Sequence, residues 1–298
     1  MPNRIHVLTV ASIGIFAFGL EAVVHEVLGH GVVCWLTGGR VVLISSTAMQ
    51  TASTSRLVSA AGPLANILFG FAALAPLSAF ARRAGAKETR AHTADVGATR
   101  IKLTSLFLYF FAFANLFLAT GYILYSGLIN FGDFAAVVAG LHPAWLYRAA
   151  LVAVGALGYR YGIAQAARFL STLIFAPPSQ ASPQSPPRPA APISFSAARR
   201  IVYTACFAGG GLFLLASIFN PISPSLILYD GLSGAIGLTL GFFLALTDLR
   251  QSSASPSGAS SIAEPKSPAA PVSLPLTIAA AIFAIAFLIF MGKGIRPS

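Results

Sequence analysis

Long runs of apolar residues dominate this chain, and the charged positions collect mainly between them. A helix needs about 20 consecutive apolar residues to cross the hydrocarbon core of a bilayer. Because the runs are continuous, they do not fit the alternating strands of a membrane barrel. They predict an all-α, polytopic helical membrane protein with about six to eight spans, since a helix satisfies its own backbone polar groups in lipid. The candidate spans are residues 7–36, 57–80, 103–129, 145–175, 201–219, 226–247 and 273–292.

Two segments lack such runs and divide the chain. Residues 177–196 and 251–273 are rich in Pro, Ser and Ala. Segments of this composition cannot bury a core, so we expect both to be disordered connections. We therefore assign residues 1–175 to a front membrane module, residues 176–197 to a linker, and residues 198–298 to additional membrane spans.

The composition agrees with a membrane protein and decides how the charge is interpreted. Hydrophobic residues make up 56% of the chain and charged residues only 9%, whereas a soluble domain carries about 25% charged residues. In a soluble protein, a formal net charge of +11 would favour a nucleic-acid partner. Here the basic residues lie between apolar runs, so we expect a lipid bilayer and no nucleic acid among the partners. The expected location is the cell membrane, with multiple spans.

The distribution of Lys and Arg predicts an orientation. Residues 81–102 are rich in Lys and Arg, whereas residues 37–56 contain only Arg40 and Arg56. Because cytoplasmic loops carry an excess of Lys and Arg, this bias places residues 81–102 and the amino-terminal end of the first span in the cytoplasm. The other end of the first span then lies on the opposite side of the membrane.

The segment 38–56 differs from the apolar runs on either side. It opens with Gly-Gly and continues with β-branched and polar residues. This pattern is compatible with a short hairpin or re-entrant loop and equally with a plain surface loop.

Four ionisable residues lie within ten positions of the first span: Glu21, His25, Glu26 and His30. A charged side chain at the centre of a span costs about 2.5–3.5 kcal/mol on insertion scales, so such residues indicate a functional site. Zinc offers the natural compensation because imidazole nitrogens bind it well. A neighbouring Glu then takes a proton from water and passes it to the leaving group.

The spacing of the two histidines carries a geometric condition. The usual form, His-Glu-x-x-His, places both imidazoles on one face of a helix, but this chain has His-Glu-x-x-x-His. On a regular α-helix, His25 and His30 lie about 140° apart around the axis. Both reach one ion only if the helix widens locally to the π form, a distortion that Gly29 would permit. Two alternative pairs have residues four positions apart, Glu26 with His30 and Glu21 with His25. In the second pair, Glu21 would be a metal ligand or would hydrogen-bond to a ligand.

Two resemblances to known enzymes follow from this motif and its surroundings. The form His-Glu-x-x-Gly-His resembles the zinc motif of dipeptidyl-peptidase III enzymes over these six residues alone. About residues 15–140 resemble the site-2 protease family of intramembrane zinc metalloproteases, which places a His-Glu motif in an early span. A Gly-Gly segment often follows in that family, comparable to residues 37–40, and a second span then opens with Gly-Pro-x-x-Asn. The corresponding residues here are Gly62-Pro63-Leu-Ala-Asn66.

The resemblance implies that an Asp near a later span is the third metal ligand. Asp133 lies where the family places this residue, although its context is Gly-Asp-Phe and not the common Leu-Asp-Gly. Asp230, in Leu-Tyr-Asp-Gly, is nearer to that pattern but lies in the rear module, so it is the second candidate. His142 is the third. We assign Asp248 to a charge anchor at the end of a span, beside Arg250.

The resemblance also implies a reaction, peptide-bond hydrolysis by a zinc-dependent intramembrane endopeptidase. His25, His30 and Asp133 would hold Zn²⁺ in a three-span core, with the fourth position open to water. Glu26 would act as general base and then as general acid. The substrate would be a membrane protein or a membrane-anchored peptide, and segment 38–56 would offer a strand edge to its unwound backbone.

Three questions stay open at this stage. The amide of Asn66 either points into the site or serves helix packing, since small and polar residues mediate contacts between membrane helices. The ionisable cluster fits a second class, a transporter or an ion- or proton-binding protein, and a third, an inactive protease-like scaffold. Site-2 proteases generally cut near the cytoplasmic face, whereas the charge bias places this site on the opposite side of the membrane.

Overall fold

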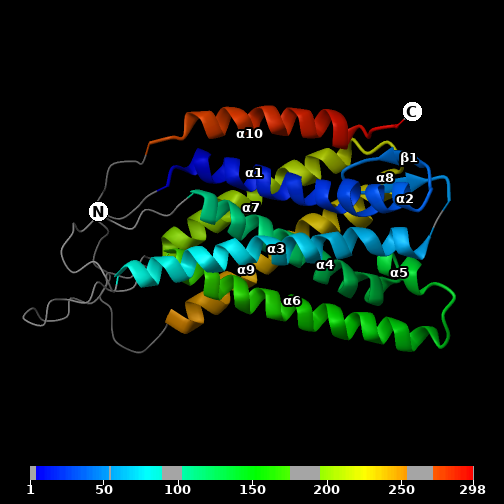
Figure 1. The fold of residues 1–298 in the computed structure, drawn as a ribbon, viewed down its shortest axis with the longest axis horizontal. Helices are drawn as coiled ribbons and strands as arrows, with labels where there is room; N and C mark the ends of the chain where they lie inside the picture. The colour runs from blue at the N-terminus through cyan, green and yellow to red at the C-terminus, as the bar shows by residue number, and fades with distance from the viewer. Residues whose placement is uncertain (1–4, 54, 89–102, 175–194, 254–270, 298) are drawn as a thin grey trace, which may run out of the picture.

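The computed structural model describes residues 5–53, 55–88, 103–174, 195–253 and 271–297, and nearly all of them are helical. Six helical segments in these ranges are long and apolar enough to cross a membrane, which confirms the predicted class of multi-pass helical membrane protein. The helices run lengthwise beside one another as a bundle (Figure 1). The front helices are α1 Val7–Val23, the π-helix η1 Val24–Gly31, α2 Val32–Leu36, α3 Arg56–Glu88, α4 Leu103–Ile129, α5 Asp133–Val138 and α6 Ala144–Ile174. The rear helices are α7 Phe195–Ile218, α8 Pro224–Leu226, the π-helix η2 Ile227–Leu232, α9 Ser233–Ser253, α10 Leu274–Phe287 and the π-helix η3 Leu288–Gly292.

Helix α6 occupies the predicted fourth span but is not one of the six apolar segments. Two of its arginines have polar partners. Arg148 donates to Gly127 O at 3.0 Å and to Leu128 O at 2.7 Å, and Arg160 lies 2.8 Å from Asp248. Asp248 therefore pairs with a charge on a neighbouring helix.

Aromatic side chains fill the centre of the bundle. Phe110 and Phe117 of α4 are fully buried, and their rings lie 5.3 and 5.1 Å from the ring of Phe242 in α9. Lipid is as apolar as these rings, so close packing holds membrane helices together. At Gly14 of α1, an added Cβ would lie only 2.2 Å from the carbonyl oxygen of Ala205 in α7. The front and rear helices thus share one core, while residues 175–194 and 254–270 of the predicted connections lie outside the described residues.

The segment after the first span forms a hairpin, which settles the choice between hairpin and plain loop. Strand β1, Val41–Ile44, pairs antiparallel with β2, Met49–Thr51. Asn220 of the rear module donates to Ser45 Oγ at 3.1 Å and to Thr47 Oγ1, which fixes the turn. Figure 1 shows β1, α2, α5 and α8 at the same end of the bundle. The predicted orientation stays a prediction, since residues 89–102 lie outside the described ranges.

Candidate metal centre

The first span changes from α-helix to π-helix at the His-Glu motif. In η1 the backbone bonds from residue i to i+5, as in the bond from Val32 N–H to Val27 O. Residues five apart therefore stack one turn apart and share a face. The rings of His25 and His30 meet edge to face, with centroids 4.8 Å apart. The widened helix that the spacing requires is thus present.

Three ligand atoms converge from two elements, η1 and α5. His25 Nε2 and His30 Nε2 each lie 3.2 Å from Asp133 Oδ2, and the two nitrogens lie 3.2 Å from each other. His25 and His30 are 7% and 6% exposed, so the group is closed to bulk water except beside Asp133. Within the described residues, this is the group of ionisable side chains that could hold a metal ion.

The hydrogen bonds on the far side of each ring fix where the imidazole lone pairs point. His30 Nδ1 lies 2.7 Å from Val58 O, and His25 Nδ1 lies 3.0 Å from Asn66 Oδ1. A carbonyl oxygen only accepts, so each Nδ1 carries the proton and each neutral ring presents an Nε2 lone pair. Two lone pairs and a carboxylate oxygen then face one another at 3.2 Å, an arrangement that only a bound cation or added protons can stabilise.

Asn66 connects His25 to the first acid of the span. Its Nδ2 donates to Glu21 Oε1 at 2.6 Å while its Oδ1 accepts from His25, and both Asn66 and Glu21 are fully buried. Metal-binding histidines are commonly oriented by such a partner on the other ring nitrogen. The amide of Asn66 thus points into the site, where it orients an imidazole, and Glu21 is the partner of that amide.

Asp133 enters the group from the first residue of the short helix α5. Gly132 precedes it with a φ of +87°, and an added Cβ there would lie 2.7 Å from the hydroxyl oxygen of Tyr122. Only glycine fits this tight turn without strain. Burial acts to raise the pKa of the Asp133 carboxyl, but when His30 and His25 carry added protons, their charges and hydrogen bonds outweigh burial and hold that pKa well below its usual range.

The first span and α3 touch through two glycines beside the imidazoles. An added Cβ at Gly29 would lie 2.6 Å from Gly62 Cα. An added Cβ at Gly62 would lie 2.4 Å from His30 Nε2 and 2.8 Å from His25 Nε2. The Gly-Pro-x-x-Asn motif of α3 thus makes room for both rings with Gly62 and orients one of them with Asn66.

Replacing Gly62 with Ala is therefore expected to displace the rings and weaken metal binding. The rings cannot move away without breaking their hydrogen bonds to Val58 O and Asn66 Oδ1. Loss of a hydrogen bond that orients a metal-binding histidine typically lowers metal affinity about 10–100-fold. Gly70→Ala, in the same helix as Gly62, is the matched control, because its Cβ would meet Leu116 Cγ of α4 at 2.7 Å, away from the rings. Zinc titration of both variants checks this, and equal affinities would contradict it.

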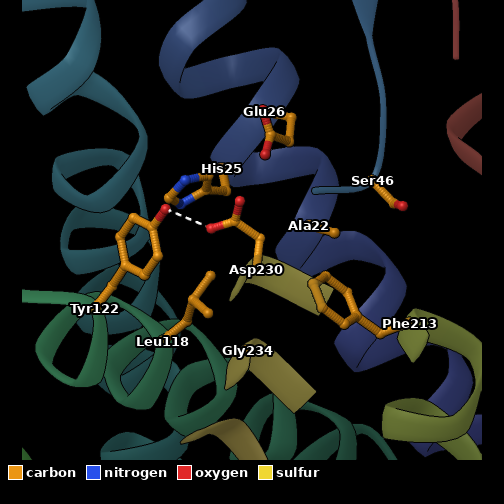
Figure 2. Close-up of a pocket in the computed structure, with 9 residues that line it drawn as sticks. All are labelled: Ala22, His25, Glu26, Ser46, Leu118, Tyr122, Phe213, Asp230 and Gly234. Carbon is orange, nitrogen blue, oxygen red and sulfur yellow. Dashed lines mark hydrogen bonds between the residues drawn. The ribbon is translucent and has the colours of Figure 1, made fainter. Parts of the chain in front are cut away.

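A cavity of about 30 Å³ adjoins His25 and has room for about one water molecule. Figure 2 shows the Glu26 and Asp230 carboxylates at this cavity, with Ser46 at its margin. Glu26 is 3% exposed, and its Oε2 atom has no hydrogen-bond partner among the described residues. A buried carboxylate oxygen without a partner is costly, so a water molecule or a substrate is the natural occupant of this cavity.

The remaining sequence candidates lie apart from the three converging ligand atoms. Asp230, in η2, accepts from the Tyr122 hydroxyl at 2.9 Å and borders the cavity. His142 is exposed. Tyr122 was not anticipated from the sequence, although its ring lies edge-on to His25 at 5.9 Å. One Tyr in a span rich in aromatic residues gives no signal that would single it out.

Comparisons with protein-family models, with curated proteins and with solved structures find no match. The resemblance to site-2 proteases therefore stays a prediction from the motifs.

Proposed function

We propose that the chain is a zinc-dependent intramembrane endopeptidase. The observation that carries the proposal is the convergence of His25 Nε2, His30 Nε2 and Asp133 Oδ2 beside a cavity that Glu26 borders. A metal ion resolves the repulsion among these three atoms. Glu26, with one oxygen unpartnered in the described part of the chain, supplies the acid–base group that hydrolysis needs.

The donor set fits zinc in type and in spacing. Zinc–nitrogen and zinc–oxygen bonds of about 2.0–2.1 Å at tetrahedral angles place ligand atoms about 3.3 Å apart, close to the observed separations of 3.2 Å. Two histidines and a carboxylate also hold iron in oxygenases. The acid that directly follows the first histidine favours a hydrolase, because this pair is typical of zinc peptidases.

Each residue of the site has a separate task. When bound, zinc acts as a Lewis acid that polarises a carbonyl group and activates water. Glu26 takes the proton of the attacking water and returns it to the leaving nitrogen. Val58 O and Asn66 hold the two imidazoles in position. Tyr122, hydrogen-bonded to Asp230, lines the cavity beside His25.

A membrane span is the substrate that suits the position of the site. His25 and Glu26 lie inside an apolar helix of the bundle and are buried, which keeps the reaction away from bulk water. The amides of a helical substrate are paired, so the backbone must unwind before it is cut. A strand edge at β1 would capture the extended form.

Removing the metal is expected to stop hydrolysis and lower the unfolding temperature. The purified chain is reconstituted in liposomes with single-span polypeptides and treated with 1,10-phenanthroline. Zinc at 100 times its Kd contributes about 2.7 kcal/mol of stability, which chelation removes. Zinc should restore both properties and magnesium neither. Cleavage that persists after the chain has lost its zinc, or a purified chain without metal, would overturn the proposal.

A proton or ion pathway is the second candidate. Glu21, His25, Glu26 and His30 form a buried group of ionisable side chains inside a span, which is typical of an ion or proton pathway. A relay requires the carboxylate of Glu21, whereas the protease requires only its acceptor oxygen. Proton flux into liposomes that disappears in Glu21→Gln, without any hydrolysis in the unaltered chain, would favour this candidate.

A further inference from the structure

The outer edge of β1 is occupied by the chain itself. Ile44 and Ile295 exchange both of their backbone hydrogen bonds, at N–O distances of 2.9 and 2.7 Å. Ser46 N–H donates to Met291 O at 2.8 Å. Ile295 therefore pairs with β1 in the antiparallel sense, and Met291, near the end of η3, accepts from the next free N–H of this edge. Residues 291–295 thus occupy the edge that a bound peptide strand would use.

This edge leads toward the cavity. Ser46 lines the cavity together with His25 and Glu26. At the carboxyl end of η1, an added Cβ on Gly31 would lie 3.5 Å from Ile44 Cδ1, so β1 passes directly beside η1. Asn220 holds the turn of the hairpin, so the edge is fixed in place.

We propose that the outer edge of β1 is the substrate-binding edge, and that residues 291–295 fill it as an internal blocking strand. This inference rests on the proposed protease function and names its substrate class. The favoured substrate is a membrane span followed by an extended segment. Its helix lies beside α1, where α10 lies, and its extended segment pairs antiparallel to β1.

Helix α10 is placed to move away from the bundle. Figure 1 shows it along one margin, beside α1. Only 17% of its apolar window is buried, against 61% for the first span, and Ala280 and Phe287 are its buried residues. Lipid replaces the contacts of an exposed apolar helix at little cost, because membrane helices associate through packing. Departure of α10 and η3 breaks the contacts of Phe283 with Phe16 and Gly19, and it exposes the buried side chains of Phe287 and Met291.

The blocking strand competes with the substrate as a tethered ligand. A tethered segment acts at an effective concentration of about millimolar, so it outcompetes a dilute substrate of equal affinity. The apparent affinity for the substrate is reduced by the fraction of molecules whose edge is free. Loss of the strand therefore raises apparent substrate affinity without a change in the metal centre.

Thiol labelling tests whether the edge is filled. The probe is a peptide that copies residues 291–297 with Ile295→Cys, its thiol activated as a thiopyridyl disulfide. Its target is the cysteine of Ile44→Cys. This substitution is made in two proteins, the otherwise unaltered chain and a chain that ends at Lys293. The native Cys34 and Cys206 are buried, and the chain with Ile44 intact is the background control. The shortened chain is expected to react at least about tenfold faster, and equal rates or no reaction with either chain would overturn the proposal.

A single-atom change tests the same point without a deletion. Gly294 has a φ of +79°, and an added Cβ there would lie 2.7 Å from Leu43 Cδ1, so Gly294→Ala is expected to dislodge the strand. Gly292→Ala is the matched control, because its Cβ would meet nothing closer than 3.4 Å. Combined with Ile44→Cys, Gly294→Ala should speed labelling and Gly292→Ala should not. Equal labelling in both would overturn the proposal.

Hydrolysis separates this inference from the proposed function. In Ile44→Cys/Ile295→Cys, the bonded strand pair has a Cα separation of about 5.5 Å, within the range of about 4.4–6.8 Å that a disulfide spans. Oxidation should stop hydrolysis, reductant should restore it, and the chain that ends at Lys293 should exceed the unaltered chain. Equal hydrolysis by the oxidised double-cysteine chain, the chain that ends at Lys293 and the unaltered chain would contradict the blocking strand but not the protease function. If labelling gives the expected result but no variant hydrolyses the substrate, the protease function would be contradicted and the blocking strand would not.

Discussion

Glu26→Gln is expected to abolish peptide hydrolysis while the chain keeps its zinc. A general base contributes about 10²–10⁴-fold to the rate, and Gln has the same shape but cannot take a proton from water. The three converging ligand atoms belong to other residues, so the metal centre stays intact. Zinc content by elemental analysis and cleavage of a single-span polypeptide in liposomes measure the two effects separately.

Glu21→Gln is the matched control for this change. Glu21 lies on the same span, is fully buried like its neighbour, and accepts a hydrogen bond from Asn66. Gln keeps that acceptor, so hydrolysis and zinc content should both change little. Loss of zinc in Glu26→Gln would assign Glu26 to the metal, and full activity in this variant would remove it from the mechanism.

The membrane-spanning fold was predictable because lipid imposes one rule on every span. Apolar runs of sufficient length must be helices, and six of the predicted segments are apolar helices in the described structure. The helix α6 was also predicted, but its arginines obscure its pattern. Their partners, such as Asp248 for Arg160, lie far away in sequence, and only the folded chain reveals them.

The local geometry of the first span could be derived from spacing alone. A spacing of five positions from His25 to His30 is incompatible with one ligand face on an α-helix, so a shared ion demands the π-helix that η1 forms. The sequence could not predict the hydrogen bonds that orient the two imidazoles. The bond from His30 to Val58 O uses a backbone atom, which no side-chain pattern reveals.

The role of the rear module was equally hidden. Asp230 and Tyr122 meet across 108 positions of sequence, and Ile295 meets Ile44 across a still longer interval. Such contacts depend on how the helices pack, and apolar helices in lipid offer many packing solutions to a reader of sequence. The structure connects the rear module to the site through η2 and through the segment that ends η3 and pairs Ile295 with Ile44.

Asp133→Asn is expected to remove the zinc. The carboxylate supplies the negative charge and the third of the three atoms that lie 3.2 Å apart, and Asn keeps the size of the side chain but not the charge. The loss of affinity should exceed the about 10–100-fold that is typical of groups outside the metal's own ligands. A 100-fold loss lowers the stability gained from saturating zinc by about 2.7 kcal/mol. Thermal unfolding with and without zinc, together with the zinc content, measures it.

Asp230→Asn makes the same chemical change at the other sequence candidate. Asp230 borders the cavity and accepts from Tyr122, but it is not one of the three converging groups. An amide oxygen still accepts that bond, so zinc content should stay near that of the unaltered chain. The reverse result, zinc kept in Asp133→Asn and lost in Asp230→Asn, would move the third ligand to the rear module. Zinc kept in both variants would leave the two histidines as the only protein ligands, and an ion held by two imidazoles alone lacks the third protein ligand that catalytic zinc sites have.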